Sequence, residues 1–162
     1  IAFGGKLGVP IRTLQVAYQE LAKLWTPVAA SSVYRSTPVG GVEQADFLNA
    51  LAAFATENSG SEILNTLHQV ENSHARTREV RWGPRTLDLD VIALWEGGEP
   101  VISTDSVLTP PHPRAWERVF VTVPWQELNL SGQLAELPGY GPVSELRSTN
   151  EEITRLEIGL NS

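Results

Sequence analysis

The chain has 162 residues, 41% of them hydrophobic and 19% charged, with a formal net charge of −7. This composition is that of a globular protein, and we expect one domain over residues 1–162. The lack of cysteine excludes a disulfide scaffold, a thiolate metal site and a cysteine nucleophile. No apolar run approaches the ~18 residues of a membrane span, and acidity disfavours nucleic acid. We therefore expect a cytoplasmic protein without a nucleic-acid or membrane partner.

The first half of the chain alternates between strand and helix patterns. Apolar periodicity predicts strands or helices, and glycine and proline predict turns. In chain order, we expect a strand ending at residue 3, a turn at Gly4 and Gly5, a helix over 10–24, a strand over 28–34, a loop over 35–46 and a strand over 47–56. A helix over 61–73 follows, with Ser59 or Ser61 as its N-cap. Because the chain begins with Ile1, we expect its first strand to be clipped.

The second half is richer in loops. We expect an arginine-rich loop over 74–86, a strand over 87–95, a turn at Gly97 and Gly98, a short strand over 101–102, a proline-rich loop over 105–118 and a strand over 119–123. Residues beyond about 128 show weak helical patterns. The β-α-β-β-α-β order of the first six elements predicts an α/β (α+β) fold of ferredoxin-like type, with an antiparallel sheet and both helices on one face.

Basic charge is concentrated in the predicted arginine loop. Four of the twelve Lys and Arg residues fall within residues 74–85, where Glu79 is the one acidic residue. Arginine matches phosphate oxygens with paired donors, so the loop indicates phosphate binding. The alternative is a solvated loop whose charges pair with nearby carboxylates.

This loop runs directly into two aspartates on a predicted strand. Alternate strand residues share a face, so Asp88 and Asp90 point together, away from Leu87, Leu89 and Val91. Two adjacent carboxylates repel unless an arginine or a metal ion lies between them. Mg²⁺ prefers such oxygen ligands, and a carboxylate pair holds two ions at ~3.5–4 Å. Together with the arginines, the pair indicates a nucleotide triphosphate site. The alternative is an exposed strand face without a ligand.

The segment RWGPRTLDLD (81–90) resembles the hallmark of the 6-hydroxymethyl-7,8-dihydropterin pyrophosphokinase (HPPK) family of folate biosynthesis. The resemblance extends to about residue 128, through YRSTPVG (34–40), DFLNA (46–50), LTPPH (108–112) and RVFV (118–121). It implies a ferredoxin-like fold with mobile active-site loops. It also implies Mg²⁺-dependent transfer of pyrophosphate from ATP to the pterin hydroxymethyl group, by in-line attack on the β-phosphorus. We expect a monomer whose partners are these two small-molecule substrates.

The resemblance also implies a role for individual residues. Asp88 and Asp90 would bind two Mg²⁺ ions, and Arg76 and Arg85 would act with them in catalysis. The ATP-binding set comprises Leu64, His68, Glu71, Arg78, Trp82, Arg85, Ile92, Thr109, His112 and Arg118. The pterin-binding set comprises Ser36, Thr37, Val39, Phe47, Asn49, Trp82 and Phe120. Asn49 would bind the amide-like edge of the pterin, and Phe47 and Phe120 would sandwich the ring. Without the resemblance, both phenylalanines would be interpreted as core and His112 as the cap of a proline-rich turn.

One turn departs from the family pattern. Family members have Gly-Ser-Asn-Leu-Gly where this chain has GGKLG at residues 4–8. Lysine cannot accept a hydrogen bond as asparagine does, so the geometry of this loop is at risk. Three hypotheses follow: an active pyrophosphokinase, a catalytically weakened nucleotide- or pterin-binding relative, and an interaction domain whose arginine loop docks an acidic partner. The third leaves Asp88, Asp90 and Asn49 unexplained.

Overall fold

The computed structural model describes residues 1–5, 11–36, 47–75, 87–146 and 152–162. Its core elements are β1 (Ala2–Gly5), α1 (Ile11–Leu24), β2 (Thr26–Ala30), β3 (Ser32–Ser36), β4 (Phe47–Ala55), α2 (Gly60–Ala75) and β5 (Leu87–Asp90). With β10 (Ile153–Gly159), the strands form an antiparallel sheet of order β10-β3-β4-β1-β5, and β2 pairs with β4. The predicted α+β ferredoxin-like core is confirmed.

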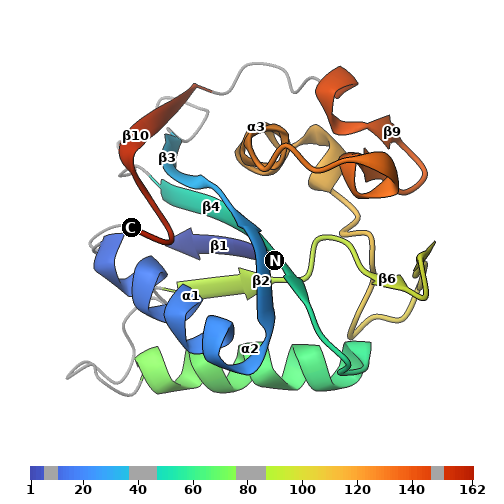
Figure 1. The fold of residues 1–162 in the computed structure, drawn as a ribbon, viewed down its shortest axis with the longest axis horizontal. Helices are drawn as coiled ribbons and strands as arrows, with labels where there is room; N and C mark the ends of the chain where they lie inside the picture. The colour runs from blue at the N-terminus through green and yellow to red at the C-terminus, as the bar shows by residue number, and fades with distance from the viewer. Residues whose placement is uncertain (6–10, 37–46, 76–86, 147–151) are drawn as a thin grey trace.

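Helices α1 and α2 cover one face of the sheet, and α3 (Val119–Glu127) lies on the opposite side (Figure 1). The core beneath α1 and α2 is apolar: Phe3 of β1, Leu14 and Leu21 of α1 and Leu67 of α2 are almost completely buried. These leucines follow the helical spacing that predicted both helices. Within the described ranges, neither these helices nor any other is long and apolar enough to cross a bilayer.

Helix α2 begins with a reciprocal capping arrangement. The backbone N–H of Glu62 donates to Ser59 Oγ at 3.2 Å, and the N–H of Ser59 donates to Glu62 Oε2 at 2.8 Å. Two N–H groups at the helix start therefore have side-chain acceptors. Of the two serines predicted as the possible N-cap, Ser59 forms the capping hydrogen bond.

The predicted strand over 119–123 is wrong, because these residues form the first half of α3. Val119, Val121 and Val123 favour β-structure locally. In the fold, however, Val121 and Trp125 of α3 pack against Leu51 of β4 in a second apolar cluster. Burial against the sheet therefore decides the conformation, as tertiary packing commonly does over propensity.

Several predicted strand boundaries also differ. Gly4 and Gly5 belong to β1 and do not form a turn. The predicted strand over 28–34 is divided at Ser31, whose N–H donates to Leu51 O and whose Oγ accepts from Leu51 N–H. The predicted strand over 87–95 ends at Asp90.

The remainder of the chain forms short elements. The turn at Gly97 and Gly98, both with positive φ, joins β6 (Trp95–Glu96) to β7 (Glu99–Pro100), so the short strand falls before residues 101–102. The predicted loop over 105–118 contains a single 3₁₀ turn among its residues. The C-terminal segment, for which the sequence indicates weak helical patterns, holds two 3₁₀ turns (Gly132–Ala135 and Val143–Glu145) and three strands: β8 (Glu136–Leu137), β9 (Gly141–Pro142) and β10. Strand β10 extends the central sheet at β3.

Candidate active site

A row of residues crosses the sheet on the face opposite α1 and α2. Tyr34 of β3 is in register with Asn49 of β4, Asn49 with Gly4 of β1, and Gly4 with Asp88 of β5. Directly paired strand residues share a face, and the Tyr34 hydroxyl bonds to Glu127 of α3, so this row faces α3. With strands ~4.8 Å apart, the backbones of Asn49 and Asp88 are separated by about 10 Å.

Gly4 keeps the space between these two side chains open. A Cβ added there would lie 3.8 Å from Asp88 Cβ and 3.9 Å from Asn49 Oδ1. A glycine within a strand often marks a close approach of another group to the backbone. Sequence reasoning missed this residue because it was assigned to a turn, although its position within an apolar strand pattern was a usable signal.

The two aspartates lie as their alternation predicts. Leu87 and Leu89 are buried in the core beneath α2, whereas Asp88 is half-buried and Asp90 exposed. Asp90 is in register with Ala2, beside the Gly4–Asp88 pair. The structure therefore places both carboxylates on the face opposite α1 and α2, at the edge strand β5.

Asn49 is oriented by β3. It is 9% exposed, and its Nδ2 donates to Ser36 Oγ at 2.9 Å within the buried interior. The Ser36 bond uses one of the two Nδ2 hydrogens, and Oδ1 lies on the Gly4 side. The amide thus has an acceptor oxygen on the Gly4 side and a second donor hydrogen besides the one bonded to Ser36, and these groups suit a flat ligand with an amide-like edge.

His112 connects the proline-rich loop to the end of β5. Its N–H donates to Ile92 O at 2.8 Å, and its Nδ1 accepts from Arg114 N–H at 3.2 Å. The accepting Nδ1 leaves the proton of the neutral ring on Nε2. Burial and the charges of Arg118 and Arg114 lower the pKa of His112, and the negative charge of Asp90 opposes this shift. A neutral imidazole whose proton is on Nε2 therefore lies in the electrostatic field of both Asp90 and Arg118.

Arg118 and Phe120 stand at the start of α3. Arg118 is the N-cap residue, and its guanidinium carbon lies 5.5 Å from the centroid of the Phe120 ring. Phe120 is half-buried and packs against the cluster around Val121. Phe47 lies two residues before Asn49 on β4, so it shares the face that α3 covers. Both phenylalanines are consequently on the Asn49 face of the sheet.

Other predicted residues have different surroundings. Leu64, His68 and Glu71 lie on α2, which packs beside the edge strand β5, and His68 is exposed. The Thr109 hydroxyl donates to Asp105 O within the proline-rich loop. Six predicted site residues lie outside the described residues: Thr37, Val39, Arg76, Arg78, Trp82 and Arg85.

An apolar cavity of about 650 Å³ lies at the other end of β4. Its walls include Trp25, Leu51 and Trp125. Of the predicted site residues that the structure describes, Ile92 alone lines it. The row from Asn49 to Asp88 therefore gives the better account of the chemistry than the cavity does.

The structure thus brings two carboxylates, a histidine and an arginine to one side of a ferredoxin-like sheet, beside a buried amide. Comparison with known proteins identifies the family. The family model described as 7,8-dihydro-6-hydroxymethylpterin-pyrophosphokinase (HPPK) matches residues 1–130. This chain belongs to that family.

Relatives named 2-amino-4-hydroxy-6-hydroxymethyldihydropteridine pyrophosphokinase are similar to most of the chain. The one from Bacillus subtilis (strain 168) is 40% identical over 132 residues, covering 79% of this chain and 75% of the relative. The one from Haemophilus influenzae is 38% identical over 130 residues, or 79% of each chain. The one from Mycobacterium leprae is 36% identical over 169 residues, covering 96% and 86%. The chain is accordingly a pyrophosphokinase, a transferase, and the hypothesis of a pure interaction domain is set aside.

Proposed function

We propose that this enzyme transfers pyrophosphate from ATP to the hydroxymethyl group of 6-hydroxymethyl-7,8-dihydropterin for folate synthesis, giving AMP and the pterin pyrophosphate. The observation that carries the proposal is the row Asn49–Gly4–Asp88. An amide suited to a pterin edge and a carboxylate suited to metal-bound phosphate come from strands that are about 10 Å apart, and both side chains border the position above Gly4, which carries no side chain.

Asn49 and the two phenylalanines would hold the pterin. Asn49 supplies a donor and an acceptor to the ring edge, with Ser36 fixing its orientation. Phe47 and Phe120, both on the Asn49 face, would stack on the two sides of the ring. A pterin bound in this way directs its hydroxymethyl group across Gly4 toward the aspartates.

Asp88 and Asp90 fit magnesium by the chemistry of their donor atoms. Among the described residues, no group of three or more His, Cys, Asp or Glu side chains forms a metal cage. Mg²⁺ is usually bound by one or two carboxylates, and water and substrate phosphates supply its remaining ligands. Asp88 and Asp90 would hold two such ions, and when bound the ions neutralise the phosphate charge at the transferred group.

His112 and Arg118 would bind the triphosphate beside the aspartates. The lowered pKa of His112 keeps its ring neutral, so Nε2–H donates to a phosphate oxygen, and Arg118 supplies a permanent positive charge. The pterin hydroxyl oxygen then attacks the β-phosphorus in line, its proton is released, and the bond to the oxygen of the α-phosphate breaks. AMP leaves without a covalent enzyme intermediate. Arg76, Arg78, Arg85 and Trp82 would complete the phosphate and nucleotide contacts.

A catalytically weakened relative is the second candidate, because Lys6 replaces the family's asparagine. The replacement of the family's serine by Gly5 is weaker support for this second candidate. Strand alternation puts buried Gly5 on the face of Phe3, beneath α1 and α2, and not on the face of Gly4. The absence of a serine side chain at position 5 therefore removes no group from the face that carries Gly4, Asn49 and Asp88.

The pairing of the C-terminal strand supports the prediction of one domain over residues 1–162. Strand β10 pairs with β3 in the central sheet, far from it in sequence. We propose that residues beyond 128 belong to the same folded unit as the site.

Measurement of AMP release from ATP, Mg²⁺ and the hydroxymethyl pterin tests the proposal. We expect release that requires the pterin and stops when the metal is chelated. Calorimetric titration with pterin and an ATP analogue separates the two candidates: binding of both with no AMP at any enzyme concentration supports the weakened relative. Absence of both binding and release refutes both.

A further inference from the structure

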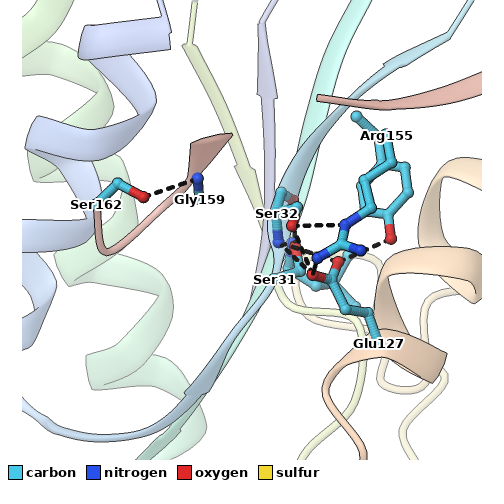
Figure 2. Close-up of polar contacts among 8 residues, drawn as sticks. Ser31, Ser32, Glu127, Arg155, Gly159 and Ser162 are labelled. Carbon is cyan, nitrogen blue, oxygen red and sulfur yellow. Dashed lines mark hydrogen bonds and ion pairs between the residues drawn. The ribbon is translucent and has the colours of Figure 1, made fainter. Parts of the chain in front are cut away.

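Glu127, the last residue of α3, lies at the centre of a polar network to which sequence reasoning assigned no role. Its carboxylate accepts the Ser32 N–H at 3.0 Å to each oxygen, the Ser32 hydroxyl at 2.6 Å, and the Tyr34 hydroxyl at 2.7 Å. Arg155 of β10 lies 3.2 Å from Glu127 Oε1 and donates from Nε to Ser32 Oγ at 2.9 Å. Figure 2 shows Glu127 and Arg155 converging on Ser32.

The electrostatics of this network fix the direction of each hydrogen bond. Burial alone would raise the pKa of Glu127, but the donors of Ser32 and Tyr34 and the charge of Arg155 hold it below its ordinary value. Burial and the bond to Glu127 raise the pKa of Tyr34. Glu127 is therefore an anion and Tyr34 a neutral donor at physiological pH, so the carboxylate acts as acceptor throughout.

The two ends of α3 have different tasks. The first turn carries Phe120, and the last residue is Glu127. The nine residues of α3 span about 13 Å. Pro124 lies inside the helix and cannot donate to the carbonyl of Phe120, so the two ends are coupled mainly through the packing of Val121 and Trp125 against the sheet. Glu127 is bonded to β3, the strand that orients the Asn49 amide. Tyr34 of β3 is in register with Asn49, and Ser36 of β3 accepts a hydrogen bond from the Asn49 side chain.

We propose that Glu127 is a positioning residue for the pterin. Its bonds to Ser32 and Tyr34 fix α3 on β3 and so set the spacing between the Phe120 ring and the Asn49 amide, with Arg155 closing the network from β10. This inference rests on the proposed function, because the ligand between Phe120 and Asn49 is taken to be the pterin. Sites of this kind require supporting hydrogen bonds to hold the contacting groups within about 0.5 Å.

A purely structural role would have a different kinetic consequence. If Glu127 served stability alone, its loss would lower the fraction of folded enzyme and leave both KM values unchanged. A positioning role raises the pterin KM more than the ATP KM. Asn49 and Phe120 both contact the pterin in this account, whereas Asp88 and Asp90 lie on β5 and Arg118 alone of the described phosphate-side residues adjoins α3. The amide Glu127→Gln is nearly isosteric but brings N–H donors into a site that needs an acceptor on both oxygens.

The test uses the full chain and compares Glu127→Gln with the control Glu117→Gln. Glu117 pairs with Arg114 at 2.6 Å on the exposed 3₁₀ turn before α3, outside the network. We expect Glu127→Gln to raise the pterin KM about tenfold, as loss of a supporting hydrogen-bond partner commonly does at a positioned site, with the ATP KM within about twofold. Glu117→Gln should leave both values unchanged. Tyr34→Phe, which keeps the ring and removes one donor, should raise the pterin KM in the same direction by a smaller factor.

Equal KM values for wild type and Glu127→Gln would overturn the inference, as would equal rises for pterin and ATP. If Glu127→Gln does not fold, Tyr34→Phe decides, and an unchanged pterin KM in that variant is the overturning result. If the wild type releases no AMP, the proposed function fails by itself. The inference is then decided by calorimetry, where an unchanged pterin Kd in Tyr34→Phe, or no pterin binding to wild type, overturns it.

Discussion

Replacement of Gly4 by alanine should separate the activity of this enzyme from its stability. Gly4 lies between Asn49 and Asp88, and its φ is not in the left-handed region, so alanine can adopt its backbone conformation. The added Cβ would meet Asp88 Cβ at 3.8 Å and Asn49 Oδ1 at 3.9 Å, which are ordinary van der Waals contacts. The substitution therefore fits the protein while it fills the open position.

The Gly4→Ala substitution should raise the stability of the protein and lower its kcat/KM. Alanine loses less backbone entropy than glycine on folding, which stabilises a compatible strand position by about 0.5–1 kcal/mol. For a chain of this size, that corresponds to a rise of roughly 1–4 °C in Tm. The same methyl group lifts any ligand crossing the sheet surface by about 1–2 Å. A displacement of ~1 Å at a reacting centre costs about 10²-fold in rate, so kcat/KM should fall by about that factor.

The assay pairs thermal unfolding with AMP release for wild type, Gly4→Ala and Gly5→Ser. Gly5→Ser changes the neighbouring residue on the opposite face, restores the residue that the family pattern has there, and should keep kcat/KM near the wild-type value. A Gly4→Ala enzyme with kcat/KM within about threefold of wild type would refute the role of the open position. A loss of stability together with activity would refute the reasoning from the Cβ contacts.

Three further predictions follow from the same structure. Asp90→Ala should abolish AMP release and leave Tm within a few degrees, because Asp90 is exposed; near-normal turnover would contradict the metal assignment. Ser59→Ala removes the N-cap of α2 and should cost about 1 kcal/mol in urea unfolding, with activity unchanged; an unchanged free energy of unfolding would show that the capping bonds contribute nothing. The pKa of Glu127 is lowered in the folded state, so its contribution to stability is present above the pKa of the unfolded carboxyl and is lost as pH falls through the folded value. Urea titrations between pH 7 and 3 should therefore show a decline that Glu127→Gln reduces, and identical slopes in both proteins would contradict the linkage.

Local patterns were sufficient for the elements that build the sheet and its covering helices. Leu14 and Leu21 of α1 and Leu67 of α2 recur at helical spacing, and each is buried where that spacing places it. The alternation of Asp88 and Asp90 with leucines fixed their common face from four consecutive residues. In both cases the periodicity of one element contains the information.

Long-range pairing was not accessible from the sequence in the same way. The role of Gly4 depends on its register with Asn49 and Asp88, which are 45 and 84 residues away in the chain. The network of Glu127 with Ser32 spans 95 residues. The valines of α3 favour a strand by local propensity, whereas the packing of Val121 and Trp125 against Leu51 of the sheet favours the helix.

The central claim is that pyrophosphate, and not a single phosphate, passes to the pterin. Phosphorus-31 NMR of a reaction containing enzyme, Mg²⁺, ATP and the hydroxymethyl pterin tests it most directly. The account predicts equal amounts of AMP and a pterin diphosphate with two coupled phosphorus signals, and no accumulation of ADP. Formation of ADP with a pterin monophosphate, or of free pyrophosphate without a pterin product, would contradict it.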